Sequence, residues 1–118
     1  MNLRRCDVVL ALFPYASRVG AKRRPCVVVQ NDEDNGKIAN TLIVFITSTL
    51  TRRGDKSHVL VDMSSSDAKQ TGLLHDSLIS CNNIATIEQR LVIKVIGSLL
   101  ATLLQQLNDC LCAALELS

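Results

Sequence analysis

Two short stretches of this sequence carry side chains that could hold and cleave a phosphate diester. Arg24 directly precedes Pro25, and the apolar run at residues 42–46 ends in Thr47 and Ser48. Because proline can begin a strand but cannot donate a hydrogen bond inside one, we expect Arg24 to be the last loop residue before a strand. A planar guanidinium and small hydroxyls at neighbouring strand ends suit a phosphate better than a carbonyl group.

The elements that must position these side chains are short strands followed by one helix. Apolar runs bounded by turn residues predict strands, and they lie at residues 7–13, 25–30, 41–47, 58–62, 77–81, 84–87 and 91–95. The polar stretches 31–40 and 49–57 are predicted to be exposed, mobile loops, in which Gly36 and Gly54 supply turns. This order indicates a mainly β protein with a C-terminal helix, arranged as a small β-barrel of SH3-like character.

The predicted helix has an unusually broad apolar face. Ser98 is expected to cap it, and the apolar residues that share one face are Leu99, Leu100, Leu103, Leu104, Leu107, Cys110, Leu111, Ala114 and Leu115. A stripe this wide could cover one sheet and still contact a partner, so we expect a homodimer.

Length, composition and charge narrow the function classes. With 118 residues and 47% hydrophobic content, the chain is expected to form a single domain over residues 1–118. Residues 1–24 hold six basic residues and one acidic residue, whereas the remainder holds seven basic and ten acidic. A polyanion would be drawn to this first hairpin; the alternative is a solvated loop kept soluble by its charge. Aromatic residues are only 3%, which argues against a base-stacking platform built from rows of Phe and Tyr.

The five cysteines lie mostly in apolar runs, which is typical of small buried side chains in a reducing cytoplasm. Cys110 and Cys112 have no second pair and no nearby histidine, so we expect no zinc site, and no other metal or cofactor. The apolar stretch after Arg4 and Arg5 is interrupted by Asp7 and is too short for a signal peptide. We therefore expect a cytoplasmic protein with no membrane partner.

A series of short motifs extends over nearly the whole chain. They are Asp7-Val8-Val9-Leu10, Phe13-Pro14, Gly20-Ala21-Lys22-Arg23-Arg24-Pro25, Val28-Val29-Gln30-Asn31-Asp32, Ile46-Thr47-Ser48, Gly72-Leu73, Asp76-Ser77, Thr86-Ile87 and Ile96-Gly97-Ser98-Leu99. Their order and spacing resemble the MazF/PemK toxins of bacterial toxin-antitoxin pairs. The resemblance implies a compact barrel that works as a homodimer, with an RNA groove across the interface.

The resemblance also implies roles for individual residues. Arg24 matches the family's catalytic arginine before proline, and Thr47 matches its catalytic threonine. Since arginine stays protonated, we assign Arg24 to charge stabilisation and proton donation, and Thr47 to a hydrogen bond with the scissile phosphate. The residues expected to contact RNA are Lys22, Arg23, Ser48, Asn83 and Tyr15. Strand alternation leaves a purely structural role open for Ser48, and Asn83 could instead be a turn residue.

Three functions compete at this point. The first is a toxin that cleaves single-stranded RNA through the ribose 2′-hydroxyl without a metal and is inhibited by an acidic antitoxin segment in the same groove. The second is a DNA gyrase poison like the CcdB toxins, whose function resides in a C-terminal tail with a tryptophan; this chain has no tryptophan. The third is a catalytically silent SH3-like interaction module. His58 and His75 are expected to be structural.

Overall fold

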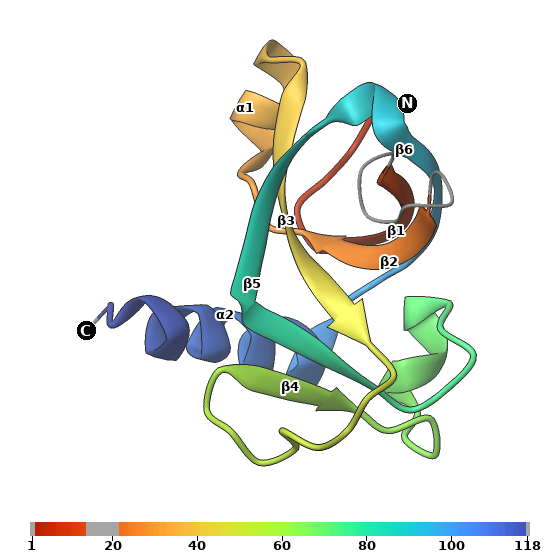
Figure 1. The fold of residues 1–118 in the computed structure, drawn as a ribbon, viewed down its shortest axis with the longest axis vertical. Coiled ribbons are helices and arrows are strands. Elements are labelled where there is room, and N and C mark those ends of the chain that lie inside the picture. Colours follow the sequence, from red (N-terminus) through yellow and green to blue (C-terminus); the bar gives the residue numbers. More distant parts are fainter. Residues whose placement is uncertain (1, 14–21, 118) are drawn as a thin grey trace.

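Strands make up most of the regular structure, and a helix follows the last of them (Figure 1). The computed structural model describes residues 2–13 and 22–117. In chain order the elements, with η for 3-10 helices, are β1 (Asp7–Phe13), β2 (Lys22–Val28), α1 (Asp32–Lys37), β3 (Asn40–Thr47), β4 (His58–Val61), η1 (Asp67–Thr71), β5 (Ser77–Glu88), η2 (Gln89–Leu91), β6 (Val92–Ser98) and α2 (Ala101–Leu115). The predicted fold class, mainly β with a C-terminal helix, is confirmed.

All six strands belong to one antiparallel sheet, in the order β4-β5-β3-β2-β1-β6. The sheet curls strongly through β6, β1, β2 and β3 (Figure 1). Its outer strands are β4 and β6, and within the described residues these two strands are not paired. The predicted barrel is therefore an open, curved sheet. The reason is that β4 packs against α2 at the far end of the sheet instead of reaching β6.

The two faces of the sheet carry two apolar clusters. Val8 belongs to one cluster and Val9 to the other, as expected for successive residues of a strand. In the first cluster Leu103 and Leu107 of α2 are buried against the sheet. The sheet of this chain thus covers much of the apolar stripe of α2. No helix in the described part of the chain is long and apolar enough to cross a membrane.

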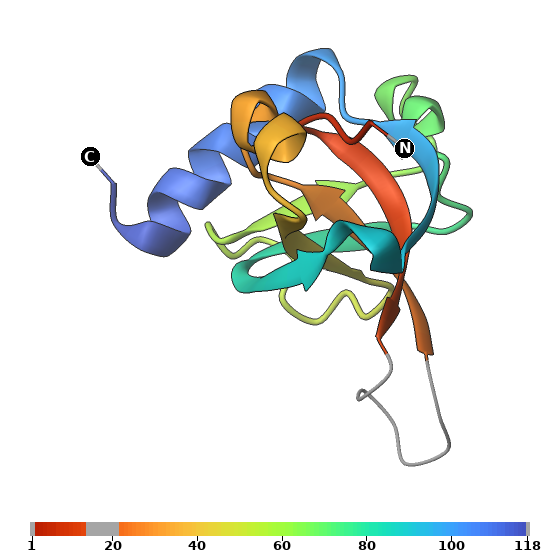
Figure 2. The ribbon, with the colours of Figure 1, turned by 90° about the horizontal axis from the view of Figure 1, so that it is seen from above.

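The start of β2 differs from the prediction. β2 begins at Lys22, and Arg24 lies inside the strand, opposite Ala11 of β1. At Pro25 the strand is paired with β1, while its pairing with β3 begins at Cys26. The missing N–H of proline is tolerated there because that edge of β2 is not yet part of the β3 ladder. Figure 2 shows β1 and β2 running together beyond the rest of the sheet.

Two helix predictions were also wrong. The stretch 31–40, expected to be a loop with a turn at Gly36, contains α1, whose N-cap Asn31 accepts a 2.8 Å hydrogen bond from the backbone N–H of Asp34. Ser98 does not cap α2 but ends β6 opposite Asp7, and Leu100 is the N-cap residue. Gly54, with φ of 97°, supplies a turn as predicted.

Two glycines allow η1 to pack directly on β6. Gly72 has φ of 74°, and a Cβ at this position would lie 2.0 Å from the backbone oxygen of Ile96. At Gly97 a Cβ would lie 2.3 Å from the oxygen of Gln70 and 2.4 Å from that of Thr71. Only hydrogen fits at either position, so these residues fix the distance between η1 and β6.

Three of the cysteines, Cys6, Cys26 and Cys81, are buried in the apolar clusters, as predicted. Burial raises the pKa of Cys26 and of Cys81 to about 12, so these thiols stay protonated at neutral pH. They therefore act as small apolar side chains.

Candidate functional site

Strands β2 and β3 bring Arg24 and Thr47 to the same place. The β2–β3 ladder ends where Cys26 pairs with Phe45, and Arg24 and Thr47 each lie two residues further along their strands. Beyond this point no β2–β3 pairing continues among the residues that the structure describes, and Arg24 stays paired with Ala11 of β1. Both residues line two neighbouring pockets, one on each side of the pair.

Both side chains of this pair are available to a ligand. The Thr47 hydroxyl accepts a 3.1 Å hydrogen bond from the backbone N–H of Thr49, so its own proton can be donated into the pocket. Arg24 is half-buried and takes part in none of the ion pairs found among the described residues. A guanidinium fork beside a hydroxyl donor can bind the oxygens of one phosphate.

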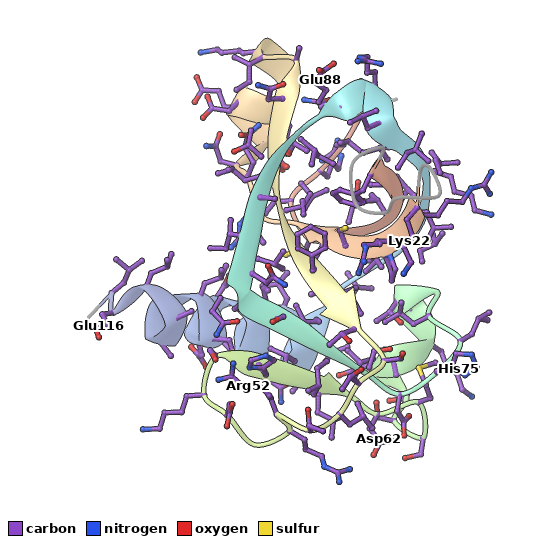
Figure 3. All side chains as sticks on the ribbon, viewed as in Figure 1. Lys22, Arg52, Asp62, His75, Glu88 and Glu116 are labelled. Carbon is purple, nitrogen blue, oxygen red and sulfur yellow. The ribbon has the colours of Figure 1, made fainter. Side chains whose placement is uncertain are left out.

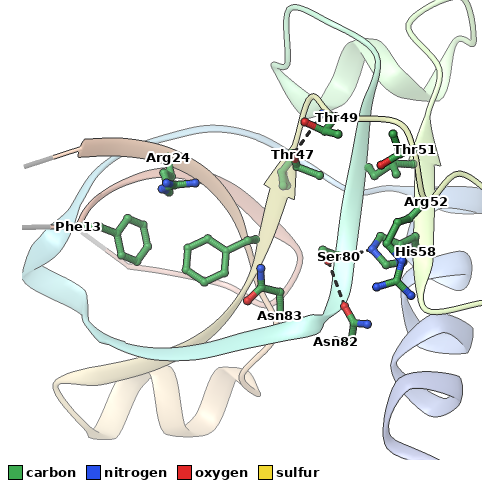
Figure 4. Close-up of a pocket in the computed structure, with 13 residues that line it drawn as sticks. Phe13, Arg24, Thr47, Thr49, Thr51, Arg52, His58, Ser80, Asn82 and Asn83 are labelled. Atoms are coloured by element: carbon green, nitrogen blue, oxygen red, sulfur yellow. Dashed lines mark hydrogen bonds between the residues drawn. The ribbon is translucent and has the colours of Figure 1, made fainter. Parts of the chain in front are cut away.

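The first pocket, which we call the aromatic pocket, has a volume of about 640 Å³. Figure 4 shows Arg24 and Phe13 at one end, Arg52 and His58 at the other, and Thr47 between them. Its lining residues are Phe13, Arg24, Phe45, Ile46, Thr47, Thr49, Thr51, Arg52, His58, Leu78, Ser80, Asn82 and Asn83.

Phe13 and Phe45 form an aromatic pair in this pocket. Their ring centroids are 5.0 Å apart and the rings are tilted by 43°. The low aromatic content argued against rows of stacking residues, but the fold gathers these two side chains from β1 and β3 beside Arg24. One such pair offers a surface on which a single nucleobase can stack.

The second pocket, which we call the basic pocket, has a volume of about 580 Å³. Lys22, Arg23 and Lys94 line it together with the Arg24–Thr47 pair, and Ser48 lies at its edge. Lys22 and His75 lie on the same flank of the molecule (Figure 3). In the described part of the chain this lining contains no carboxylate. The pocket therefore attracts anions.

The end of the aromatic pocket beside β4 is polar. His58 contacts Ser57 and Ser80, each at 3.1 Å from a ring nitrogen. Partial burial lowers the pKa of His58 below its usual range, and the positive charge of Arg52 lowers it further, while Asp55 opposes both. The imidazole is accordingly neutral at pH 7.

A bulge in β5 presents two asparagines to the same pocket. Val44 pairs with Ile84, whereas the next residue, Phe45, pairs with Ser80, so residues 81–83 form an insertion in β5. Bulges re-aim side chains and are common beside binding sites. Asn83 is therefore a bulge residue within one long strand, and its interpretation as a turn between two strands was wrong.

The fold gathers most of the predicted site residues. Lys22, Arg23 and Ser48 line the basic pocket, and Asn83 lines the aromatic pocket; Tyr15 lies outside the described residues. The residues of the aromatic pocket that sequence reasoning missed are Phe13, Phe45, Thr49, Thr51, Arg52 and Ser80, whereas Asn82 was expected on the RNA-facing surface together with Asn83. One signal in the sequence could have indicated Thr49, Thr51 and Arg52: they follow β3 directly, and a loop that follows a strand of the site lies beside the site.

The curved antiparallel sheet carries the guanidinium of Arg24 and the hydroxyl of Thr47 between a basic pocket and an aromatic pocket. Such a surface can bind an extended polyanion. A family model described as the PemK-like, MazF-like toxin of type II toxin-antitoxin systems matches residues 4–115. The chain belongs to this family, and the resemblance noted in its sequence is confirmed.

Solved structures show the same fold. An endoribonuclease in complex with its cognate antitoxin, from a mycobacterial species, is 23% identical with a TM-score of 0.78, over 98% of this chain and 97% of that chain. The Mycobacterium tuberculosis toxin MazF-mt6 is 26% identical with a TM-score of 0.74, over 95% and 98%. A MazE-MazF structure from Deinococcus radiodurans is 18% identical with a TM-score of 0.76, over 100% and 99%. A comparison with curated proteins gives no significant match.

Proposed function

We propose that this toxin is a sequence-specific, metal-independent endoribonuclease that cleaves single-stranded RNA in the cytoplasm. The observation that carries the proposal is that Arg24 and Thr47 both line both pockets. Family membership supports it, as does similarity to structures named as endoribonucleases. A basic pocket on one side of the pair and an aromatic pocket on the other would hold the RNA strand across the bond that is cleaved.

The reaction uses the ribose 2′-hydroxyl as nucleophile. Its oxygen attacks the adjacent phosphorus, the bond from phosphorus to the 5′-oxygen breaks, and the 2′ proton passes to solvent water, which returns one proton to the leaving 5′-oxygen. Thr47 donates a hydrogen bond to a non-bridging oxygen, and Arg24 stabilises the charge of the phosphorane and donates a hydrogen bond to the leaving 5′-oxygen. The products are a cyclic 2′,3′-phosphate and a 5′-hydroxyl.

We expect the purified protein to cleave a long single-stranded RNA in the presence of EDTA, because this mechanism uses side chains and solvent water alone. Duplex RNA should resist, since its bases are not free to enter the aromatic pocket. End-group analysis of the fragments measures the products. A strict requirement for magnesium would contradict the mechanism.

The same incubation separates the alternatives. DNA gyrase assayed in parallel should retain its activity; inhibition of gyrase without RNA cleavage would favour a CcdB-like poison. A protein that leaves both RNA and gyrase unchanged would be a silent interaction module.

We also propose that an acidic antitoxin segment binds the basic pocket and competes with RNA. Complexes of relatives support an antitoxin partner, since both the mycobacterial and the Deinococcus structures contain one. The charge of Lys22, Arg23 and Lys94 attracts an acidic peptide and an RNA backbone alike.

Reversing the charge of Lys22 and Arg23 to Glu should weaken RNA binding and antitoxin binding together. The salt dependence of RNA affinity should flatten by roughly one unit of log–log slope per lost phosphate contact. Lys37→Glu with Arg90→Glu is the matched control, because these exposed residues line neither pocket. An antitoxin that binds simultaneously with RNA would show that inhibition uses another surface.

A homodimer remains part of the proposal. The sheet of this chain buries Leu103 and Leu107 of the α2 stripe, but Leu100 and Leu115 of the same stripe are exposed. Other large apolar side chains are exposed as well, among them Leu74 at 86% exposure, Ile84 and Val95. Burying them in a second copy would remove apolar surface from water. We expect sedimentation at micromolar concentration to give twice the mass of the chain, and a monomer would count against the dimer.

A further inference from the structure

The polar end of the aromatic pocket contains a chain of hydrogen bonds whose direction can be worked out. The Ser80 hydroxyl donates to the side-chain oxygen of Asn82 at 3.2 Å. With the Ser80 proton directed to Asn82, the 3.1 Å contact between Ser80 and the Nε2 of His58 is one in which His58 donates. The Nδ1 of the neutral ring then accepts from Ser57.

This chain fixes the orientation of the Asn82 amide. An asparagine that is free to rotate can turn either its oxygen or its nitrogen toward a ligand, so it can bind a donor or an acceptor equally well. Here the oxygen is held toward Ser80, which is only 8% exposed, and Figure 4 shows the amide nitrogen on the side of Arg52. Asn82 therefore presents hydrogen-bond donors to the pocket.

Arg52 adds further donors at the same end. Its Nε bonds Asp55 at 2.7 Å, which orients the guanidinium and leaves the terminal nitrogens for a ligand. Phe13 lies toward the other end of the same pocket (Figure 4), while Phe45 pairs with Ser80 across β3 and β5. A nucleobase at the polar end thus meets a cluster of donors.

We propose, building on the endoribonuclease function above, that this polar end binds a nucleotide beside the cleaved bond and selects a keto-bearing base, guanine or uracil. Guanine offers the acceptors O6 and N7, and uracil offers O4, to the Asn82 amide and the Arg52 guanidinium. Adenine and cytosine place an amino group at the corresponding edge, which would face these donors unpaired. Asn82 is the specificity residue, and Ser80 and His58 position it.

The decisive variant is Asn82→Asp, which replaces the donor by an acceptor at constant shape while Ser80 still holds one oxygen. With a random-sequence single-stranded RNA pool, sequencing of the cleavage sites should show one position in the wild type where guanine and uracil are preferred by about 10-fold. In Asn82→Asp the preference at that position should shift to adenine and cytosine. Thr86→Asp, exposed on the same strand and lining neither pocket, adds the same charge and should leave the preference unchanged.

A second pair of variants tests the positioning role. Ser80→Ala frees the Asn82 amide to rotate, so discrimination between keto and amino bases should fall. Ser80→Thr keeps the hydroxyl and should restore the discrimination. Thermal unfolding of each variant shows that the fold is retained.

Direct binding separates this inference from the proposed function. Fluorescence anisotropy should show that the wild type binds oligouridylate about 10-fold more tightly than oligocytidylate. Asn82→Asp should instead bind oligocytidylate more tightly. Equal affinities, or a preference that Asn82→Asp leaves unchanged, would overturn the inference even if the protein cleaves RNA. A protein that prefers oligouridylate but never cleaves would instead refute the proposed function alone.

Discussion

Replacing Arg24 by alanine is expected to lower the rate of RNA cleavage by about 10²-fold or more, as for the loss of one group that stabilises a transition state. The fold should be retained, because Arg24 lies on the part of β2 that extends beyond the β3 ladder. Single-turnover cleavage of a short RNA measures the rate, and thermal unfolding measures the fold. Arg53→Ala removes the same charge from an exposed position outside both pockets and should cleave normally.

The same loss is expected for Thr47→Ala, since the hydroxyl donates to the phosphate in our mechanism. Thr47→Ser keeps the hydroxyl and its acceptor contact with the N–H of Thr49, so it should recover much of the rate. Arg24→Lys keeps the charge but loses the planar fork, and should remain well below the wild type. Near wild-type cleavage by a folded Thr47→Ala or Arg24→Ala protein would show that the pair is not the catalytic centre.

The end of β3 at Thr47 could be anticipated because it depends on local signals, whereas the grouping of Arg24 with Thr47 came from the motif resemblance. β1 has the predicted bounds, and β3 begins one residue earlier than predicted and ends at Thr47 as predicted. Apolar periodicity and turn residues set such boundaries within a few residues of sequence. Motif resemblance then supplied the roles of the two residues.

The far end of the site could not be anticipated because it depends on pairing between distant segments. The Asn82-Asn83 pair looks like a break between two strands in the sequence, yet β3 pairs with both halves of β5 and turns the break into a bulge. The pairing of β4 with β5, in which His58 lies opposite Ser80, then links His58 to Asn82 through the Ser80 hydroxyl. No local pattern encodes such a contact.

Helix α1 escaped prediction for a related reason. Its six residues are almost all polar, so they carry no apolar periodicity. Buried amide contacts hold it: within the segment Asn35 bonds Gln30 and Thr41. One distant contact adds to them, from the Gln89 side chain to the backbone oxygen of Asn35, and no local pattern indicates that contact.

A methyl group at Gly97 is expected to have the largest effect on stability. In Gly97→Ala the new Cβ would meet the backbone of Gln70 and Thr71 at 2.3 to 2.4 Å, and backbone atoms cannot move aside as a flexible side chain can. Forcing η1 away from β6 should cost about 3 kcal/mol of unfolding free energy and lower the melting temperature by roughly 10 °C.

Gly36→Ala is the matched control for this substitution. No atom lies within 4 Å of a Cβ at Gly36, and the residue is inside α1, where alanine is favoured over glycine by about 0.5–1 kcal/mol. It should therefore melt at or slightly above the wild-type temperature. Because Gly72, the C-cap residue of η1, and Ile96 of β6 both line the basic pocket, Gly97→Ala should also weaken RNA binding at temperatures where the protein is still folded. An unchanged melting temperature of Gly97→Ala would mean that η1 and β6 are not in direct backbone contact. If the variant is destabilised but binds RNA as the wild type does, the shape of the basic pocket does not depend on that contact.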